Sequence, residues 1–256
     1  MNHSVAIVTG SSHGIGRATA LRLAKEFSAV VVVARDESAL TEVSKEIAAA
    51  GAKPLVLRRD LSRVESAREV IDATLNAFGR IDALVNIAGS VPRIDLLETT
   101  DEQWDAGFAL KFHGGRRLAL NAWDALKDSN GAVVFLSGAA ADHPQTMGAA
   151  VSSVNAAIEA LSKAFADRGL IDGVQVNTVS PGAIMTRRRM GMIEKIAAAK
   201  GISIESAKSS YLEHARINRF GEPEEIAELI AFCVSPKMRW MTGSVLRMDG
   251  GETNSL

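Results

Sequence analysis

Three glycines near the start of the chain have the spacing of a phosphate-binding turn. The segment reads Val5-Ala-Ile-Val-Thr9-Gly10-Ser-Ser12-His13-Gly14-Ile15-Gly16-Arg17, with an apolar run before the glycines and an alanine- and leucine-rich stretch after them. Gly10 can take backbone angles that a side chain forbids, and Gly14 and Gly16 let a pyrophosphate and the neighbouring strand come close. The first amides of the following helix would face the phosphates with the positive end of the helix dipole. Between a strand and a helix, this pattern predicts a dinucleotide-binding turn.

Apolar runs alternate with helical stretches along the whole chain. The apolar runs are mostly continuous, as is typical of strands covered on both faces; they span residues 5–8, 29–34, 54–57, 83–87, 132–136, 174–179 and 244–248. The helical stretches include residues 16–27, 38–50, 63–78, 101–126 and 151–168. This order predicts one Rossmann-type α/β domain over residues 1–256: a doubly wound parallel sheet of about seven strands, helices on both faces, and a ligand crevice at the strands' carboxyl ends.

The composition excludes several classes of protein. Lys plus Arg number 29 against 30 for Asp plus Glu, so a general attraction to nucleic acid or to a membrane surface is not expected. The single cysteine, Cys233, excludes an internal disulfide and suits a reducing compartment. No apolar run is long enough to span a bilayer, and no Cys/His cluster has the spacing of metal ligands. We therefore expect a cytoplasmic protein without a metal, a membrane or a nucleic-acid partner.

Further motifs follow the glycine turn as far as the end of the chain. They are Asp60-Leu61, Asn86-Ile-Ala88-Gly89, Ser180-Pro181-Gly182 with Thr186, Arg219-Phe-Gly-Glu-Pro-Glu-Glu-Ile-Ala227, and Thr242-Gly243 through Asp249-Gly-Gly251. Together they resemble the short-chain dehydrogenase/reductase family over nearly the whole sequence. The resemblance implies that Asp60 contacts adenine, that Ile87 replaces the second asparagine of an Asn-Asn-Ala-Gly signature, and that the segment ending at Thr186 holds the nicotinamide amide. Residues 185–217 resemble the family's substrate lid.

The resemblance thus implies a nicotinamide dinucleotide cofactor held by residues from several motifs. The expected set is Thr9, Gly10, Ser12, His13, Gly14, Ile15, Gly16, Arg35, Asp60, Leu61, Asn86, Ala88, Gly89, Asn155, Pro181, Gly182 and Thr186. An NAD site needs a carboxylate at the end of the second strand, where this chain has Ala34 followed by Arg35. An arginine can bind a 2′-phosphate bidentately, and His13 adds a basic group. The negative charge of Asp36, beside Arg35, weakens this prediction. We expect NADP(H) in preference to NAD(H).

The family's catalytic groups are replaced at all of their expected positions. The family uses a tyrosine as acid or base, a lysine four residues later, a serine and an asparagine. The helix from Val151 resembles the family's catalytic helix, with Val151 at the tyrosine position and Asn155 at the lysine position. The spacing of four residues places both on one helix face, but valine cannot give or take a proton. The usual interval from Val151 reaches Gly138 instead of a serine, and Ser137 substitutes only if the strand bends or the loop is longer.

Lys111 is the candidate for the missing proton donor. It lies seven residues after Trp104, where the family's pattern expects the asparagine. We hypothesise that its ammonium enters the crevice from the opposite helix, where a dry environment would lower its pKa toward neutrality. The alternative, which is slightly favoured because surface lysines are common, is that Lys111 reaches solvent or pairs with a carboxylate.

Tyr211 is the second candidate, since it is the only tyrosine and lies in the lid. A lid could bring it over the nicotinamide, although packing is the commoner role of such a residue. His143 and Asp142 follow the fifth strand and could act through water, or could form an ordinary polar turn. Arg187-Arg188-Arg189 opens the lid; a solvated charge run is the favoured interpretation, and attraction of an acidic substrate is the alternative.

Two functions remain open at this point. The first is an NADP(H)-dependent oxidoreductase that acts on a small carbonyl or alcohol with a nonstandard proton donor. The second is a dinucleotide-binding protein with little or no dehydrogenase activity that serves as a sensor, scaffold or partner subunit. The helix from Val151 carries an apolar stripe for the sheet and alanines on another face, and with the family resemblance this predicts a homodimer or homotetramer.

Overall fold

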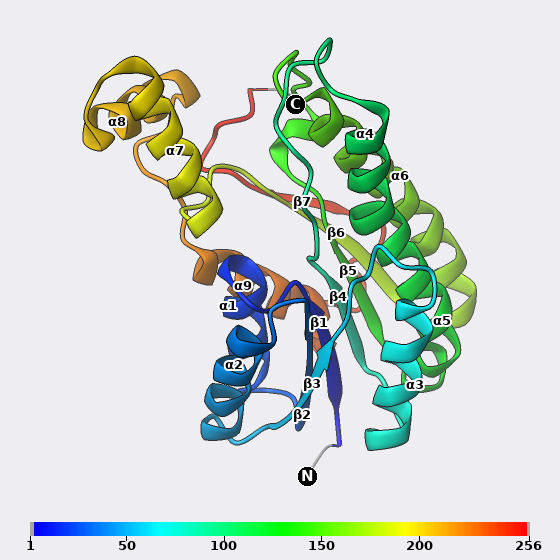
Figure 1. Cartoon of the computed structure of the whole chain (residues 1–256). Helices are drawn as coiled ribbons and strands as arrows, with labels where there is room; N and C mark the ends of the chain where they lie inside the picture. The colour runs from blue at the N-terminus through cyan, green and yellow to red at the C-terminus, as the bar shows by residue number, and fades with distance from the viewer. Residues whose placement is uncertain (1–2, 255–256) are drawn as a thin grey trace.

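The computed structural model describes residues 3–254, and their strands form one parallel sheet (Figure 1). The strands are β1 (Val5–Thr9), β2 (Ala29–Ala34), β3 (Lys53–Arg58), β4 (Ala83–Asn86), β5 (Ala132–Leu136), β6 (Gln175–Pro181) and β7 (Val245–Met248). Their order across the seven-stranded sheet is β3-β2-β1-β4-β5-β6-β7, and every neighbouring pair is parallel. The predicted doubly wound sheet is confirmed. The order reverses between β1 and β4, and in such sheets ligands bind at this switch point.

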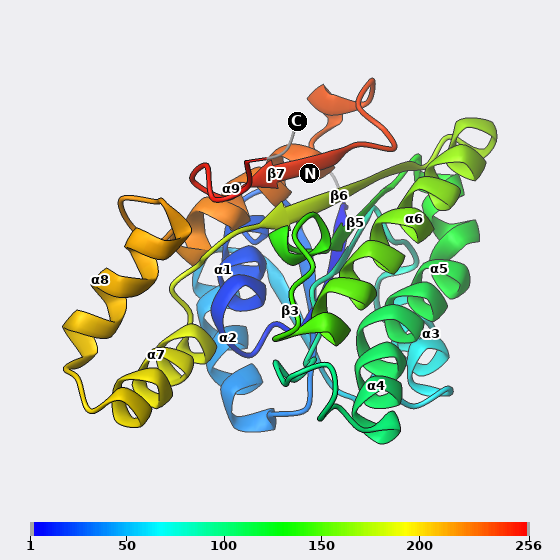
Figure 2. The same cartoon turned by 90° about the horizontal axis from the view of Figure 1, so that it is seen from above.

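Helices cover both faces of the sheet, as Figures 1 and 2 show from two directions. One face carries α1 (Gly14–Leu23), α2 (Glu37–Ala49) and α9 (Pro223–Val234). The other carries α3 (Ser66–Phe78), α4 (Asp101–Gly107), α5 (Gly115–Ser129) and α6 (Ala149–Asp172). Short turns complete the chain: η2 (Ala139–Ala141) after β5 and η3 (Pro236–Met238) after α9. Among residues 3–254 no helix is both long and apolar enough to cross a bilayer.

The continuous apolar strands supply both hydrophobic cores. Side chains alternate between the two faces of a strand, so Val5 and Ile7 of β1 join the core beneath α3, α5 and α6. Ala6 and Val8 join the core beneath α1, α2 and α9. All four residues are at most 2% exposed. A strand buried on both faces cannot alternate apolar with polar residues, which explains the sequence pattern.

The predicted helical stretch over residues 101–126 is helical throughout, but its hydrogen-bonding pattern changes in the middle. A π-helical segment, η1 (Phe108–Gly114), lies between α4 and α5 and contains Lys111. Gly114 and Gly115 follow this wider turn and allow close packing: a Cβ on Gly114 would lie 2.8 Å from the Leu61 carbonyl oxygen, and one on Gly115 would lie 3.3 Å from the Phe135 ring. The extra residue in the turn changes the direction in which the side chains of η1 leave the helix.

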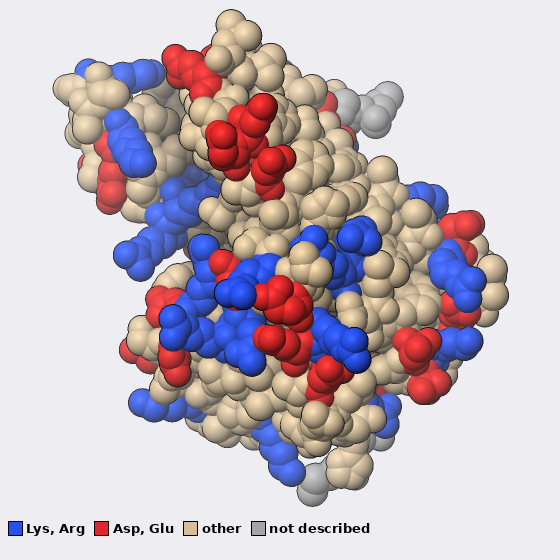
Figure 3. All heavy atoms as spheres, turned by 45° about the vertical axis from the view of Figure 1, so that its right-hand side comes forward, with Lys and Arg blue, Asp and Glu red and all other residues tan. Residues whose placement is uncertain are grey.

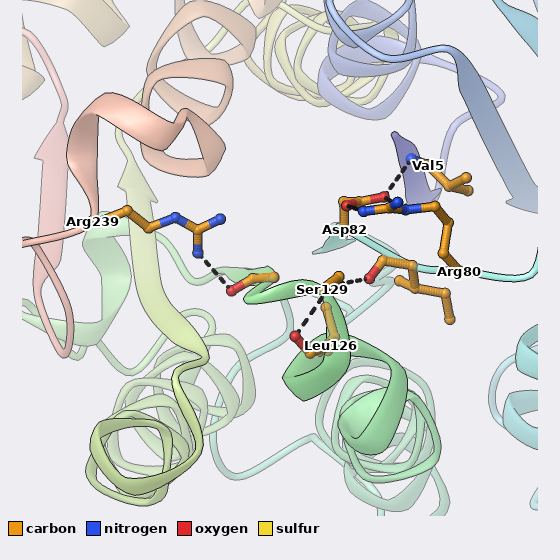
Figure 4. Close-up of polar contacts among 8 residues, drawn as sticks. Val5, Arg80, Asp82, Leu126, Ser129 and Arg239 are labelled. Carbon is orange, nitrogen blue, oxygen red and sulfur yellow. Dashed lines mark hydrogen bonds and ion pairs between the residues drawn. The ribbon is translucent and has the colours of Figure 1, made fainter. Parts of the chain in front are cut away.

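Hydrogen bonds hold the end of the sheet opposite the crevice (Figure 4). The Asp82 carboxylate accepts from the Val5 amide at 2.8 Å and from Arg80 at 2.6 Å. Ser129 donates to the Ile81 carbonyl at 2.6 Å, and Arg239 donates to the Gly131 carbonyl at 3.0 Å. These contacts join β1, β4 and the C-terminal end of α5. They lie at the amino ends of the strands, opposite the carboxyl ends where the candidate site is found.

The lid is a separate helical unit beside the crevice. Residues 185–217 contain α7 (Arg187–Lys200) and α8 (Ile204–Ala215), which project from the body at the upper left of Figure 1. The two helices share a small core of their own that includes Ile193, Ala197 and Ala207. Thr186 caps α7 by accepting from the Arg189 amide at 3.2 Å. The lid therefore folds around its own apolar residues and joins the body at Thr186.

Candidate functional site

The glycine turn has the shape that a phosphate requires. Gly10 has a φ of +66° and Gly14 a φ of +52°, in the left-handed region that favours glycine. A Cβ on Gly16 would lie 2.1 Å from the Gly10 carbonyl oxygen, so the turn closes only because Gly16 has no side chain. His13 is the N-cap of α1, and its side chain makes no capping hydrogen bond. The first amides of α1 therefore lack an acceptor within the helix, and a bound anion can supply one.

Thr9 positions this turn against β4. Its hydroxyl donates to the Val85 carbonyl at 3.3 Å and accepts from the amides of Ile87 and Ala88 at 2.9 and 3.0 Å. The residue is 1% exposed and its side chain is fully occupied by these bonds. Thr9 thus holds β1 and β4 together at the switch point, while Ser12, His13 and Ile15 lie in the turn that faces the crevice.

The end of β2 presents a basic group in place of a free carboxylate. Asp36 accepts from the Ala39 amide at 3.1 Å and from the Ser38 hydroxyl at 2.8 Å, so it caps α2, and His13 lies 3.4 Å from it. These hydrogen bonds, that from Ser38 first, lower the pKa of Asp36. Arg35 is exposed and makes no hydrogen bond or ion pair within residues 3–254. The carboxylate that weakened the NADP(H) prediction is therefore engaged in a helix cap.

The remaining expected cofactor residues lie along the carboxyl edge of the sheet. Asp60 binds the Ser62 amide and hydroxyl at 3.0 and 2.8 Å, and Leu61 is buried beside it. The Thr186 methyl group would be 3.2 Å from a Cβ on Gly14, so the start of the lid touches the glycine turn. Gly182, after Pro181, packs against Asp249 with no room for a side chain.

Asn86, the last residue of β4, lies at the same edge of the sheet. It is 8% exposed, its side chain packs beside Gly115, and neither of its polar atoms has a hydrogen-bond partner within residues 3–254.

Lys111 turns into the crevice and meets Asn155. Its Nζ donates to Asn155 Oδ1 at 2.5 Å and to the Ser137 carbonyl at 3.1 Å. Asn155 is 3% exposed and donates in turn to the Gly138 carbonyl at 3.4 Å. The favoured alternative, a lysine that reaches solvent or pairs with a carboxylate, does not describe this geometry. The side chains of η1 and α6 therefore converge at the carboxyl end of β5.

Gly89 makes room for the lysine stem. A Cβ on Gly89 would lie 2.8 Å from Lys111 Cδ and 3.0 Å from Cγ. The glycine that ends the Asn86–Gly89 motif thus lies beside the Lys111 stem, and a side chain there would displace it.

The surroundings of Lys111 lower its pKa to about 7. Desolvation is the main cause, because burial of the ammonium among η1, β5 and α6 removes hydration. The positive charge of Arg188 lowers the pKa further, whereas Glu159 opposes the shift. Near neutral pH the side chain can therefore exist in both protonation states, which is what an acid or base in catalysis requires.

The hydroxyl of Ser137 bonds to neither Lys111 nor Asn155. It donates to Glu159, and the Gly138 amide donates to it. Gly138 has an extended backbone, and a Cβ there would lie 3.0 Å from Asn155 Nδ2. The position beside Asn155 that the family's interval gives to a serine thus has no hydroxyl. Val151 lies one helical turn before Asn155 and packs partly against the core, so it adds only an apolar surface.

Tyr211 connects the lid helices with the C-terminal segment. Its hydroxyl accepts from Arg189 at 2.8 Å and donates to Glu252 at 3.4 Å, and its ring lies 5.4 Å from that of Phe220. Burial is the main cause that raises the pKa of Tyr211 above its ordinary value of 10.0.

Asp142 pairs with Arg247 at 3.0 Å, and His143 lies on the same loop. Among residues 3–254 no group of three or more His, Cys, Asp or Glu side chains could hold a metal ion.

Two residues near Lys111 escaped the sequence-based prediction. Glu159 follows Asn155 by four residues and so shares its helix face, a spacing that could have identified it. Burial raises the pKa of its carboxyl group, although the Ser137 hydroxyl counteracts this. Arg188 donates to the Val91 carbonyl at 2.5 Å and lies close enough to Lys111 to affect its charge. No local pattern separates Arg188 from the arginines on either side of it.

Known proteins resemble this chain over its full length. A model of the enoyl-(acyl carrier protein) reductase family matches residues 10–253. An uncharacterized oxidoreductase of Methylorubrum extorquens is 32% identical over 96% of both chains. The short-chain reductase protein NovJ of Streptomyces niveus is also 32% identical, over 97% of this chain and 93% of its own.

A solved structure agrees with these matches. The L-sorbose reductase of Gluconobacter frateurii, crystallised with NADPH and L-sorbose, superposes over 100% of both chains with a TM-score of 0.94 at 30% identity. The sheet, the glycine turn and the motifs along its carboxyl edge also agree with the pattern found in the sequence. The chain belongs to the short-chain dehydrogenase/reductase family of oxidoreductases.

Proposed function

We propose that the protein is an NADPH-dependent carbonyl reductase in which Lys111 supplies the proton. The observation that carries this proposal is the contact of Lys111 Nζ with Asn155 Oδ1 and the Ser137 carbonyl, at the end of β5. In the family's pattern the tyrosine and the lysine lie on the helix that carries Asn155, which supports the same site for the ammonium. The substrate is a small carbonyl compound, or its alcohol in the reverse direction.

The residues at the end of β2 support NADPH over NADH. Arg35 is exposed and could bind a 2′-phosphate bidentately, although its charge also acts on the Asp60 carboxylate. Asp36 is held in the α2 cap. The glycine turn and the uncapped start of α1 would hold the pyrophosphate. The presence of NADPH in the L-sorbose reductase structure agrees with this preference.

The chemistry is divided between the cofactor and Lys111. The nicotinamide, when bound, supplies a hydride to the carbonyl carbon. Lys111 donates a proton from Nζ to the carbonyl oxygen, so that the alcohol leaves neutral and the amine takes a proton back from solvent. Asn155 and the Ser137 carbonyl orient the ammonium through their hydrogen bonds. Because the ammonium is positive, it also stabilises the negative charge that develops on the oxygen.

Lysine suits this role here because of its lowered pKa. A tyrosine has an ordinary pKa of about 10 and needs a neighbouring cation to become a useful acid at neutral pH. Lys111 reaches a pKa of about 7 through burial and the charge of Arg188. A single residue can thus combine the charge of the family's lysine with the proton transfer of its tyrosine.

The test compares Lys111→Met with Lys195→Met. Lys195 lies exposed on α7, so its loss controls for the removal of a positive charge. Fluorescence titration with NADPH and NADH should show tighter binding of NADPH to both variants. With NADPH and a panel of aldehydes and ketones, Lys111→Met should lower kcat by roughly 10²–10⁴-fold, the usual contribution of a general acid. An unchanged kcat in Lys111→Met would exclude Lys111 as the donor.

The second candidate function is dinucleotide binding without turnover. Val151 and Gly138 favour it, because the crevice lacks both hydroxyl groups of the family's pattern. This function predicts tight NADPH binding and no turnover on any substrate of the panel, in the wild type as in Lys111→Met. Measurable reduction by the wild type would exclude it.

A further inference from the structure

The three arginines that open the lid have different environments. Arg187 is exposed and makes no hydrogen bond or ion pair within residues 3–254. Arg189 donates to the Tyr211 hydroxyl, and its guanidinium lies 5.0 Å from the centre of that ring. Arg188 donates to the Val91 carbonyl in the segment after β4 at 2.5 Å. Arg187 and Arg188 are exposed, as expected of a solvated charge run, while Arg188 and Arg189 also contact the Val91 carbonyl and the Tyr211 hydroxyl.

Arg188 lies at the reaction side of the crevice. Val91 is buried and follows Gly89, which touches the stem of Lys111. The Val91 carbonyl occupies a single donor of the guanidinium, and no carboxylate within residues 3–254 forms an ion pair with Arg188. The residue stays exposed to solvent on one side. A planar guanidinium with unused donors is thus held next to the expected position of the substrate.

Little negative charge balances these two cations. Glu159 is near Lys111 but accepts from the Ser137 hydroxyl, and Glu252 binds Tyr211 at 3.4 Å. Arg189 lies next to Arg188 and adds to the positive charge. In Figure 3, Lys and Arg side chains lie near the hollow beside the projecting lid, and Asp and Glu side chains lie among those on the body. An anion that entered here would find donors and uncompensated positive charge.

We propose that the substrate carries an anionic oxygen group, a carboxylate or a phosphate, near its carbonyl, and that Arg188 binds this group. The inference rests on the proposed function, since it places the carbonyl of the same substrate at Lys111. Arg188 joins the lid to the β4 loop, so a bound anion would also hold the lid over the crevice. The cofactor's pyrophosphate is the competing source of the anion, but it is expected at the glycine turn, while Arg188 extends to Val91 and Lys111.

The experiment measures binding to the protein saturated with NADP⁺, so it does not depend on turnover. The probes are pyruvate, acetoacetate and levulinate with their methyl esters, and dihydroxyacetone phosphate with dihydroxyacetone. Each pair keeps the carbonyl and removes the negative charge. Calorimetry should show that at least one anion binds about tenfold or more tightly than its neutral partner, the range expected of a charge-assisted contact. The chemical class of that anion distinguishes carboxylate from phosphate.

Variants assign the preference to a residue. Arg188→Gln should abolish the preference for the anion, Arg188→Lys should keep part of it, and Arg187→Gln should behave as the wild type. The neutral partners and NADPH should bind all variants within about twofold. Three results would overturn the inference: no preference in the wild type, equal losses in Arg187→Gln and Arg188→Gln, or a loss of NADPH affinity in Arg188→Gln that matches the loss for the anion.

These outcomes are independent of the role of Lys111. Turnover of neutral carbonyls without any preference for anions would leave the proposed reduction intact and remove only the role of Arg188. A preference for anions that depends on Arg188, with turnover unaffected in Lys111→Met, would keep the role of Arg188 and remove Lys111 as the proton donor.

Discussion

Lys111 and Asn155 stand in each other's expected places, and their side chains still meet. The family's pattern puts an asparagine on the helix after the fourth strand and a lysine on the catalytic helix, whereas this chain has the opposite order. The contact at 2.5 Å shows that one ammonium and one amide share the pocket at the end of β5. Because the two side chains meet from opposite helices, we expect that either position could supply the ammonium.

A reciprocal exchange tests this interpretation. Asn155→Lys alone should lower the melting temperature, because it places two ammonium groups in one partly buried pocket. Lys111→Asn alone should leave two amides, and the double variant should recover stability. A double-mutant cycle from thermal unfolding should give a favourable coupling of about 0.5–3 kcal/mol, the range for side chains in contact. Additive effects would show that the two residues are independent.

The exchanged pair also provides a route to the family's ordinary chemistry. Adding Val151→Tyr to the double variant should create or raise carbonyl reduction with NADPH, since the new phenol lies one turn from the new lysine. Val151→Phe in the same background is the matched control, because it adds the ring without the hydroxyl. Equal rates for the two would mean that the tyrosine does not transfer the proton.

The lowered pKa of Lys111 predicts a pH dependence. Reduction requires the protonated amine, so kcat should be steady below a pH of about 7 and fall as the pH rises further. The alcohol oxidation should show the opposite trend. The stability of the fold should also depend on pH. Between pH values of about 7 and 10.5, Lys111 binds more protons in the unfolded chain than in the folded one, so the free energy of unfolding rises with pH. Lys111→Met should lose both trends; pH–rate profiles and melting curves at several pH values would measure them.

The sequence could predict the face of the catalytic helix but not the direction of each side chain. The spacing of Val151 and Asn155 placed both on one face without any structure. Lys111 was harder, because a lysine stem can reach solvent or the interior, and only the missing side chain of Gly89 opens the inward path. Ser137 stayed open for a similar reason: the end of β5 decides whether its hydroxyl meets Glu159 or the crevice.

At the scale of elements, the π turn and its glycine neighbours position Lys111. The stem passes over Gly89, and η1 packs through Gly114 against the Leu61 carbonyl. The sequence predicted the strands well because burial on both faces forces them to be continuously apolar. The sequence did not predict the π-helical segment η1. The packing of this segment involves Leu61 and Phe135, which are distant in sequence.

Gly89→Ala tests the path of the lysine. The new Cβ would lie 2.8 Å from Lys111 Cδ, so the side chain must shift and its hydrogen bond to Asn155 must weaken. We expect kcat to fall about tenfold or more, because small displacements of a catalytic group are costly. NADPH affinity should change little.

Gly191→Ala in α7 serves as its control. No atom lies within 4 Å of a Cβ there, so this variant should keep full activity and gain roughly 0.5–1 kcal/mol from helix propensity. If Gly89→Ala behaved in the same way, the close approach of Gly89 to Lys111 would not control catalysis.

At the scale of the whole molecule, the lid and the body are distinct hydrophobic units. The body has one core on each side of the sheet, and the lid has its own around Ile193. The lid contacts the body through the Thr186 methyl group at the glycine turn and through hydrogen bonds of Arg188 to Val91 and of Tyr211 to Glu252. Its apolar cluster also includes Ala183 and Phe220 of the body.

The outer face of α6 bears on assembly. The helix buries Val154, Ile158 and Phe165 against the sheet, while Ala156, Ala160 and Ala164 lie exposed at intervals of four residues. A face of small residues allows a second helix to approach closely. Leu170 and Ile171, near the end of α6, are 71% and 78% exposed. We therefore predict a homodimer or homotetramer that uses this face.

Ala160→Glu should weaken that assembly. A carboxylate at the centre of a close helix contact would be buried without a partner, and two copies would repel each other across a symmetric interface. Light scattering after gel filtration should show a smaller species for Ala160→Glu than for the wild type at the same concentration. Ala199→Glu, on the exposed side of α7, adds the same charge away from this face and should not change the size. A monomeric wild type, or an Ala160→Glu variant of unchanged size, would show that the alanines of α6 face solvent instead of a second copy.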